Sequence, residues 1–104
     1  MKLKILVGCP TSDYQEYALQ EYAEAIKSLT YKNYDHLLVD NSKENSYLKK
    51  IKATGLQAIK STYFESAKKR ILTSRNILRQ IVIEKNYDYL LSLEQDILPP
   101  KDII

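Results

Sequence analysis

Residues 87–96 read Tyr-Asp-Tyr-Leu-Leu-Ser-Leu-Glu-Gln-Asp, a mostly apolar run that ends in two carboxylates separated by one residue. A short apolar run of this kind is typical of a buried strand. Because side chains alternate along an extended chain, Glu94 and Asp96 would point the same way at the end of that strand. Such a pair can bind a divalent cation through oxygen, and a phosphate group can complete the coordination. The prolines at 99 and 100 then turn the chain away.

Upstream of this run, short apolar segments alternate with helical patterns. The segments 2–8, 34–39 and 56–60 are predicted to be strands, and Cys9-Pro10-Thr11 is expected to end the first. Helices are predicted from 12 or 13 to about 30, from 45 or 46 to 55, and from 65 or 66 to 85. A capping box, Ser12 or Asp13 with Gln15 or Glu16, would start the first helix. The expected inner faces are Tyr14, Ala18, Tyr22, Ala25, Ile26 and Leu29 in the first helix, Tyr47, Leu48 and Ile51 in the second, and Ile71, Ser74, Leu78, Ile81 and Val82 in the third.

The order β-α-β-α-β-α-β with short connections predicts an α/β fold. It implies three layers, a mostly parallel β-sheet with helices on both faces, and right-handed crossovers. Ligands bind such sheets at the carboxyl ends of the strands, near a topological switch point. Polar residues gather at those ends: Thr11 and Ser12, Asp40 to Ser42, and Glu94 to Asp96. The sequence therefore predicts one binding site at this edge of the sheet.

The composition is that of one small globular domain spanning residues 1–104, with 44% hydrophobic and 28% charged residues. No apolar run approaches the ~20 residues that span a bilayer, and the first ten residues do not resemble a signal peptide. One cysteine excludes an internal disulfide and favours a reducing, cytoplasmic location. Cys9 is expected to be a small buried hydrophobe, and His36 a surface histidine or one with its hydrogen bonds satisfied.

Charge is unevenly distributed. Residues 41–79 hold ten Lys or Arg and two acidic residues, a net charge of +8, so the remainder carries −5 of the total of +3. A basic segment can attract nucleic acid or hold the phosphates of a small ligand. It can also simply be the solvated outer faces of two helices. Aromatic residues do not interleave with the basic ones as on a base-stacking platform, which argues against nucleic-acid binding.

Several nucleotide-binding folds are excluded by the loop after the first strand. Gly8-Cys9-Pro10-Thr11-Ser12-Asp13 contains neither GxGxxG nor GxxxxGK[ST], so dinucleotide and P-loop sites are not expected. The missing glycine-rich loop also argues against sugar nucleotidyltransferases. A two-component receiver domain would need acidic residues directly after the strand, and this chain has Gly8 and Cys9 there. What remains is a nucleotide site built from side chains and a metal ion.

Four motifs, in order, resemble the family 2 inverting glycosyltransferases with the GT-A fold. They are Cys9-Pro10-Thr11, Val39-Asp40-Asn41-Ser42 for the family's V-D-[ND]-x-S, Ser74-Arg75-Asn76 for its A-R-N, and Leu93-Glu94-Gln95-Asp96 for its L-D-x-D. Together they cover almost the whole chain. The resemblance implies the nucleotide-sugar-binding half of a GT-A, Rossmann-like domain.

By this resemblance, Pro10 and Thr11 would line the base pocket, and Asp40, followed by Asn41, would accept a hydrogen bond from the base. Glu94 would face the ribose, and Arg75 would lie near the nucleotide, as a partner of a phosphate or of a loop. The DXD-like motif would place Asp96 on Mg²⁺ or Mn²⁺, and a UDP-sugar is the expected donor. Glu94 replaces the family's first Asp and is one methylene longer.

Simpler interpretations of these residues stay open. Asp40-Asn41-Ser42 suits a turn, and Asp96 suits the turn into the prolines. Arg75 suits an exposed helix position, and Glu94 a strand-end charge in water. The acceptor half and catalytic base of a glycosyltransferase are not found in 104 residues, so no catalytic residue is assigned, and the chain is expected to be an incomplete domain. An exposed sheet edge would then favour pairing with a second chain or another copy. The alternative is a non-catalytic α/β interaction or scaffold domain.

Overall fold

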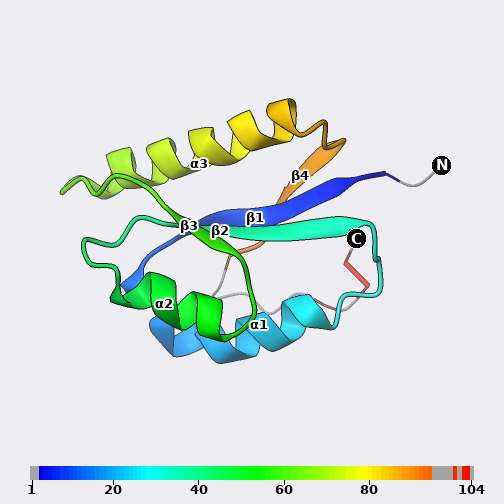
Figure 1. Cartoon of the computed structure of the whole chain (residues 1–104), viewed down its shortest axis with the longest axis horizontal. Coiled ribbons are helices and arrows are strands. Elements are labelled where there is room, and N and C mark those ends of the chain that lie inside the picture. The colour runs from blue at the N-terminus through cyan, green and yellow to red at the C-terminus, as the bar shows by residue number, and fades with distance from the viewer. Residues whose placement is uncertain (1–2, 95–99, 101, 104) are drawn as a thin grey trace.

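A computed structural model describes residues 3–94, 100, 102 and 103. They form an α/β fold around a four-stranded sheet in the order β3-β2-β1-β4, and every strand pair is parallel (Figure 1). The strands are β1 (Ile5–Thr11), β2 (Tyr34–Asp40), β3 (Ala58–Lys60) and β4 (Tyr89–Ser92). The α/β class and the parallel sheet predicted from the sequence are confirmed. No helix in the described part of the chain is both long and apolar enough to cross a membrane.

In the described part of the chain, α-helices cover both faces of the sheet, with α3 on one side and α1 and α2 on the other (Figure 1). They are α1 (Leu19–Lys27), α2 (Ser46–Ala53) and α3 (Ala67–Glu84). The chain steps outward from β1 to β2 to β3, and α3 then carries it back to β4 on the far side of β1. Right-handed crossovers put helices on opposite faces when the direction of stepping reverses. The strand order therefore accounts for the separate position of α3.

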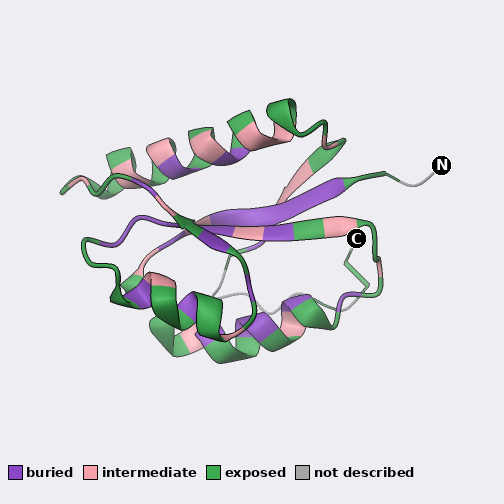
Figure 2. Ribbon diagram, viewed as in Figure 1, coloured by how far each residue is buried: buried purple, intermediate pink, exposed green. Residues whose placement is uncertain are grey.

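The alternation of side chains along the inner strands divides the core in two. On the side of α1 and α2, Val7, Cys9 and Leu38 pack with the buried Tyr22 and Ile51. The opposite face packs against α3 in a second, smaller cluster, with Leu6, Val39 and Leu78 at its centre. Figure 2 shows β1 buried through most of its length between these layers. Burial of each large aliphatic side chain contributes about 1.5–3 kcal/mol to folding.

Gly8, in the middle of β1, allows a close approach of the backbone. It is paired with Leu37 of β2 on one side and with Ser92 of β4 on the other. A Cβ atom at this position would overlap the carbonyl oxygen of Leu37 and lie 3.3 Å from a methyl carbon of Leu78. The strand therefore requires glycine here.

Most predicted boundaries are confirmed to within a few residues. Ser66 caps α3, and its side chain accepts a hydrogen bond from the Lys69 amide over 3.3 Å. Gly55 follows α2 with a φ of 91°, the left-handed conformation that favours glycine after a helix. β3 and β4 are shorter than the apolar runs that predicted them. Ile71, expected on the inner face of α3, is 41% exposed.

The prediction that Cys9-Pro10-Thr11 ends the first strand is wrong, because β1 continues through Thr11. On the β2 side, the Ile5 amide donates to the carbonyl of Asn33, just before β2, and the Thr11 carbonyl accepts from the amide of Asn41, just after it. The N–H and C=O groups of successive residues point to opposite edges of a strand. The nitrogen of Pro10 therefore points toward the β4 side. Pairing with β4 ends at Gly8, and the N–H that Pro10 lacks has no ladder partner to lose there.

The prediction of one helix from residue 12 or 13 to about 30 is also wrong. The segment begins with the 3-10 helix η1 (Asp13–Ala18), and α1 follows it. The Ser12 side chain makes no capping bond, and the Asp13 amide donates instead to Ser42 Oγ over 2.8 Å. Tyr14, expected in the core, is 78% exposed. A contact with the distant end of β2 therefore replaces the predicted local cap.

Candidate functional site

The carboxyl ends of β1, β2 and β4 meet beside the first half of α3. β1 lies between the other two strands, so this is the topological switch point of the sheet, where α/β proteins bind ligands. A pocket of about 290 Å³ opens there. It is lined by Pro10, Thr11, Ser12, Tyr14, Gln15, Asn41, Ala67, Arg70, Ile71, Arg75 and Glu94.

Five of the six residues predicted to bind a nucleotide line this pocket. They are Pro10, Thr11, Asn41, Arg75 and Glu94. They come from β1, from the residue after β2, from α3 and from the segment after β4. The fold thus brings together residues that are up to 84 positions apart in sequence.

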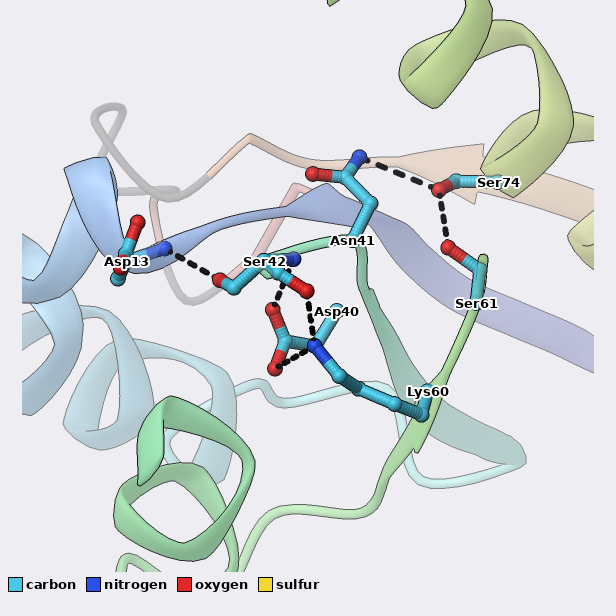
Figure 3. Close-up of polar contacts among 7 residues, drawn as sticks. All are labelled: Asp13, Asp40, Asn41, Ser42, Lys60, Ser61 and Ser74. Carbon is cyan, nitrogen blue, oxygen red and sulfur yellow. Dashed lines mark hydrogen bonds and ion pairs between the residues drawn. The ribbon is translucent and has the colours of Figure 1, made fainter. Parts of the chain in front are cut away.

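Asp40 is not among the residues that line the pocket. Its side chain is fully buried and accepts a hydrogen bond from the Ser42 amide over 2.9 Å (Figure 3). Its other carboxylate oxygen lies 3.4 Å from Lys60 Nζ, which also donates to the Ser42 carbonyl. Asp40 therefore holds the turn after β2, as the turn interpretation expects. Its role toward a base stays a prediction.

Asn41 is held in place from two sides. Its amide N–H donates to the Thr11 carbonyl over 2.9 Å, and its side-chain Nδ2 donates to Ser74 Oγ over 3.2 Å. Ser74 in turn contacts Ser61 Oγ at 3.2 Å, so a buried chain of three polar side chains joins β2, α3 and the segment after β3 (Figure 3). Asn41 is therefore fixed where it meets the pocket.

The two arginines of the pocket differ in their contacts. Arg70 Nη1 donates to the carbonyls of Phe64 (2.5 Å) and Glu65 (2.9 Å), and its guanidinium lies 5.2 Å from the centre of the Tyr63 ring. Arg70 thus anchors the loop before α3. Arg75 is exposed and makes no hydrogen bond or ion pair with the described residues. Its planar guanidinium is available for a phosphate or carboxylate.

The prediction missed several residues of the pocket wall, among them Tyr14, Gln15 and Arg70. The sequence pattern predicts a capping-box role for Gln15 or Glu16. In the structure the Oε1 atom of Gln15 is buried and has no hydrogen-bond partner among the residues described. Because a buried carbonyl oxygen without a partner is costly, this atom is a good acceptor for a ligand donor. The place of Gln15 in η1, four residues after the end of β1, is the signal in the sequence that points to the pocket.

Glu94 is the acidic residue in the described lining of the pocket. Asp96, the predicted metal ligand, lies outside the described residues. Within the described part of the chain, no group of three or more His, Cys, Asp or Glu side chains is placed to hold a metal ion. Glu94 has the oxygen chemistry that Mg²⁺ or Mn²⁺ prefers, but the structure gives one carboxylate here, and metal binding stays a prediction.

His36 and Cys9 are both buried. His36 is 8% exposed, so the expectation of a surface histidine is wrong. Its Nε2 lies 2.9 Å from the Tyr22 hydroxyl, but its Nδ1 has no partner among the described residues, so its hydrogen bonds are satisfied only in part. Burial lowers the pKa of the His36 imidazole to about 4, so the ring is neutral at pH 7. The same burial raises the pKa of the Tyr22 phenol far above its usual value.

The basic segment 41–79 has mixed roles. Lys60 pairs with Asp40, Lys50 forms an exposed pair with Glu16 at 2.8 Å, and Arg75 lines the pocket. The remaining Lys and Arg residues of the segment, apart from Arg70, are exposed: Lys43, Lys49, Lys52, Lys68, Lys69 and Arg79. Most of the positive charge is therefore on outer surfaces, as the solvated-face interpretation expects.

Comparison with known proteins finds no protein-family model that matches this sequence and no curated protein with significant similarity to it.

Proposed function

We propose that this chain binds the nucleotide of a nucleoside diphosphate sugar, as the donor-binding part of a family 2-like glycosyltransferase. The observation that carries the proposal is the pocket at the switch point, with Pro10, Thr11, Asn41, Arg75 and Glu94 in its wall. Its volume of about 290 Å³ is near the lower end of small-molecule sites. We take this space to receive the nucleoside, and UDP is the expected nucleotide.

The chemistry of the wall suits the parts of such a ligand. The Asn41 amide and the Gln15 carbonyl offer hydrogen bonds to a base edge. Arg75 offers planar, charge-assisted hydrogen bonds to phosphate oxygens. α3 begins with Lys68, Lys69 and Arg70 and has no acidic residue in its first turn, so the positive end of its dipole is reinforced. The charge balance near the pocket therefore favours an anion.

Glycosyl transfer from a nucleotide-sugar releases a nucleoside diphosphate. Arg75 would stabilise the negative charge that develops on this leaving group, and Glu94 would hold the ribose hydroxyls. A divalent cation bound through Asp96, Mg²⁺ or Mn²⁺, would supply further neutralisation of the diphosphate. No described residue is assigned as the catalytic base, so the proposal concerns donor binding.

Thermal unfolding with UDP, GDP and their sugar conjugates, each with and without Mn²⁺, tests this proposal. A ligand that binds the folded state raises the unfolding midpoint, and we expect a rise that needs both the nucleotide and the metal. Arg75→Ala should abolish most of the rise. Arg79→Ala is the matched control, because Arg79 is exposed on the same helix and does not line the pocket. The absence of any shift in the parent chain would reject donor binding and favour the interaction or scaffold domain.

A further inference from the structure

The ladder between β1 and β4 ends at the pair Gly8–Ser92. Glu94 lies two residues beyond this last pair and still lines the pocket. Something other than the sheet must therefore hold the chain where Glu94 enters the wall. Part of the answer is Leu93, whose side chain is buried in the core on the side of α1.

The second contact is made by Tyr22, a fully buried residue of α1. Its hydroxyl donates a hydrogen bond to the Leu93 carbonyl over 2.8 Å. The carbonyl oxygen of Leu93 and the Cα of Glu94 belong to the same planar peptide unit. A bond that fixes the oxygen therefore also fixes the plane from which the Glu94 side chain starts.

The Tyr22 hydroxyl is itself oriented by His36 of β2. A phenol has one proton, and Tyr22 gives it to a carbonyl that can only accept. The contact of 2.9 Å between Tyr22 Oη and His36 Nε2 must then have the histidine as donor, which specifies the Nε2–H tautomer. His36 Nδ1 is left without a partner in the described part of the chain. The direction of the hydrogen bonds thus runs from His36 to Tyr22 to Leu93.

We propose that Tyr22 is a positioning residue for the candidate site: its hydroxyl, oriented by His36, fixes the Leu93–Glu94 peptide and so sets the place of the Glu94 carboxylate in the pocket wall. The ligand-binding consequence rests on the proposed function, but the positioning itself does not. β2, α1 and the segment after β4 are joined by these two bonds across the buried face of β1.

The test uses backbone NMR of the ligand-free chain. In Tyr22→Phe, the order parameter of the Glu94 amide should fall from that of a rigid backbone, about 0.85, toward the flexible range near 0.6. The Leu93 carbonyl ¹³C resonance should shift, and the His36 ¹⁵N resonances should change from one neutral tautomer to a mixture. Tyr34→Phe is the matched control, since Tyr34 also donates to a backbone carbonyl, that of Ile26, at 2.7 Å.

A conservative variant separates positioning from general destabilisation. His36→Gln retains an N–H donor that can reach Tyr22 and should keep the Glu94 order parameter of the parent, whereas His36→Leu should lower it. Equal order parameters at Glu94 in Tyr22→Phe and Tyr34→Phe would overturn the proposal. The proposal would also be overturned if the order parameters fell by a similar amount throughout the chain in both Tyr22→Phe and Tyr34→Phe.

A binding arm links the positioning to function. If the parent chain binds UDP with Mn²⁺, Tyr22→Phe should weaken that affinity by about 3- to 10-fold, the change expected for losing one ordinary hydrogen bond, and Tyr34→Phe should not. If the parent binds no nucleotide, the proposed function fails, while the NMR comparison still decides whether Tyr22 positions Glu94. Unchanged affinity in a Tyr22→Phe variant of a binding-competent parent would contradict the inference.

Discussion

The side chain of Asn41 donates a hydrogen bond to the hydroxyl of Ser74 over 3.2 Å, which joins the end of β2 to α3 across a buried interface. The resemblance to family 2 glycosyltransferases expects alanine at position 74. In this chain the serine hydroxyl instead connects Asn41 with Ser61. The pocket wall on this side is therefore fixed by a polar contact.

Ser74→Ala should destabilise the fold by about 1–2 kcal/mol, because the buried side chains of Asn41 and Ser61 each lose a partner. Urea unfolding at pH 7 measures this change. Ser92→Ala, at an exposed position of β4, is the control and should stay within about 0.5 kcal/mol of the parent. Equal stability of the two variants would show that the Ser74 bonds contribute nothing net.

Lys60→Met should destabilise the fold by about 1–3 kcal/mol, since it leaves the fully buried Asp40 carboxylate without its cation. This expected loss is smaller than that for breaking a fully buried ion pair, because the Lys60 side chain is a quarter exposed. Lys50→Met removes the exposed pair with Glu16 and should cost less than about 1 kcal/mol. A cost for Lys60→Met no larger than for Lys50→Met would contradict this assignment.

His36 should make the fold less stable in acid. The pKa of its imidazole is lowered by burial from 6.5 to about 4, so the unfolded chain binds a proton at pH values where the folded chain does not. The contribution of the neutral His36 to the free energy of unfolding is fully present above pH 6.5. It is lost as the pH falls from 6.5 to about 4, and the loss is on the order of 3 kcal/mol. Urea midpoints from pH 4 to 7 measure the effect. His36→Gln removes the titrating group, and its curve should be flatter; parallel curves would contradict the prediction.

Gly8→Ala should destabilise the fold by more than about 2 kcal/mol, because the new methyl group meets the Leu37 backbone, which cannot rotate away. Thermal unfolding measures the loss. Ala25→Gly, within α1, is a useful reference and should cost about 1 kcal/mol. A smaller loss for Gly8→Ala than for Ala25→Gly would mean that β1 and β2 separate more easily than their pairing indicates.

Patterns within one element were predicted well from the sequence. α3 combines helical periodicity with a serine cap at Ser66, and α2 ends before a glycine at 55; both signals are local. The first helix was predicted poorly, because its first amide bonds to Ser42, 29 residues away. The local pattern at Pro10 predicts a strand end, but the effect of this proline depends on which neighbouring strand its nitrogen faces. That information lies in the sheet order, and no local pattern carries it.

The candidate site shows the same division. The rule that ligands bind at the carboxyl ends of parallel strands predicted where the pocket lies, and five of the six residues that the resemblance implied line it. The pairing of Asp40 with Lys60 was not predicted, because it depends on the register between β2 and β3. The Tyr22 contacts were missed for a similar reason. His36 and Leu93, which contact its hydroxyl, are distant from it in sequence, and Leu93 contributes a backbone carbonyl that any residue has.

Because Lys60 neutralises the Asp40 carboxylate, the charged side chains that remain in the described lining of the pocket are Arg70, Arg75 and Glu94. The sum of their charges is positive, and a recess with low-dielectric walls concentrates such a field toward its opening. A nucleoside diphosphate would be drawn in before it touches the protein. Added salt shortens the reach of this field, to ~8 Å at physiological ionic strength. The rate of capture would therefore fall with ionic strength, while the rate of escape would change little.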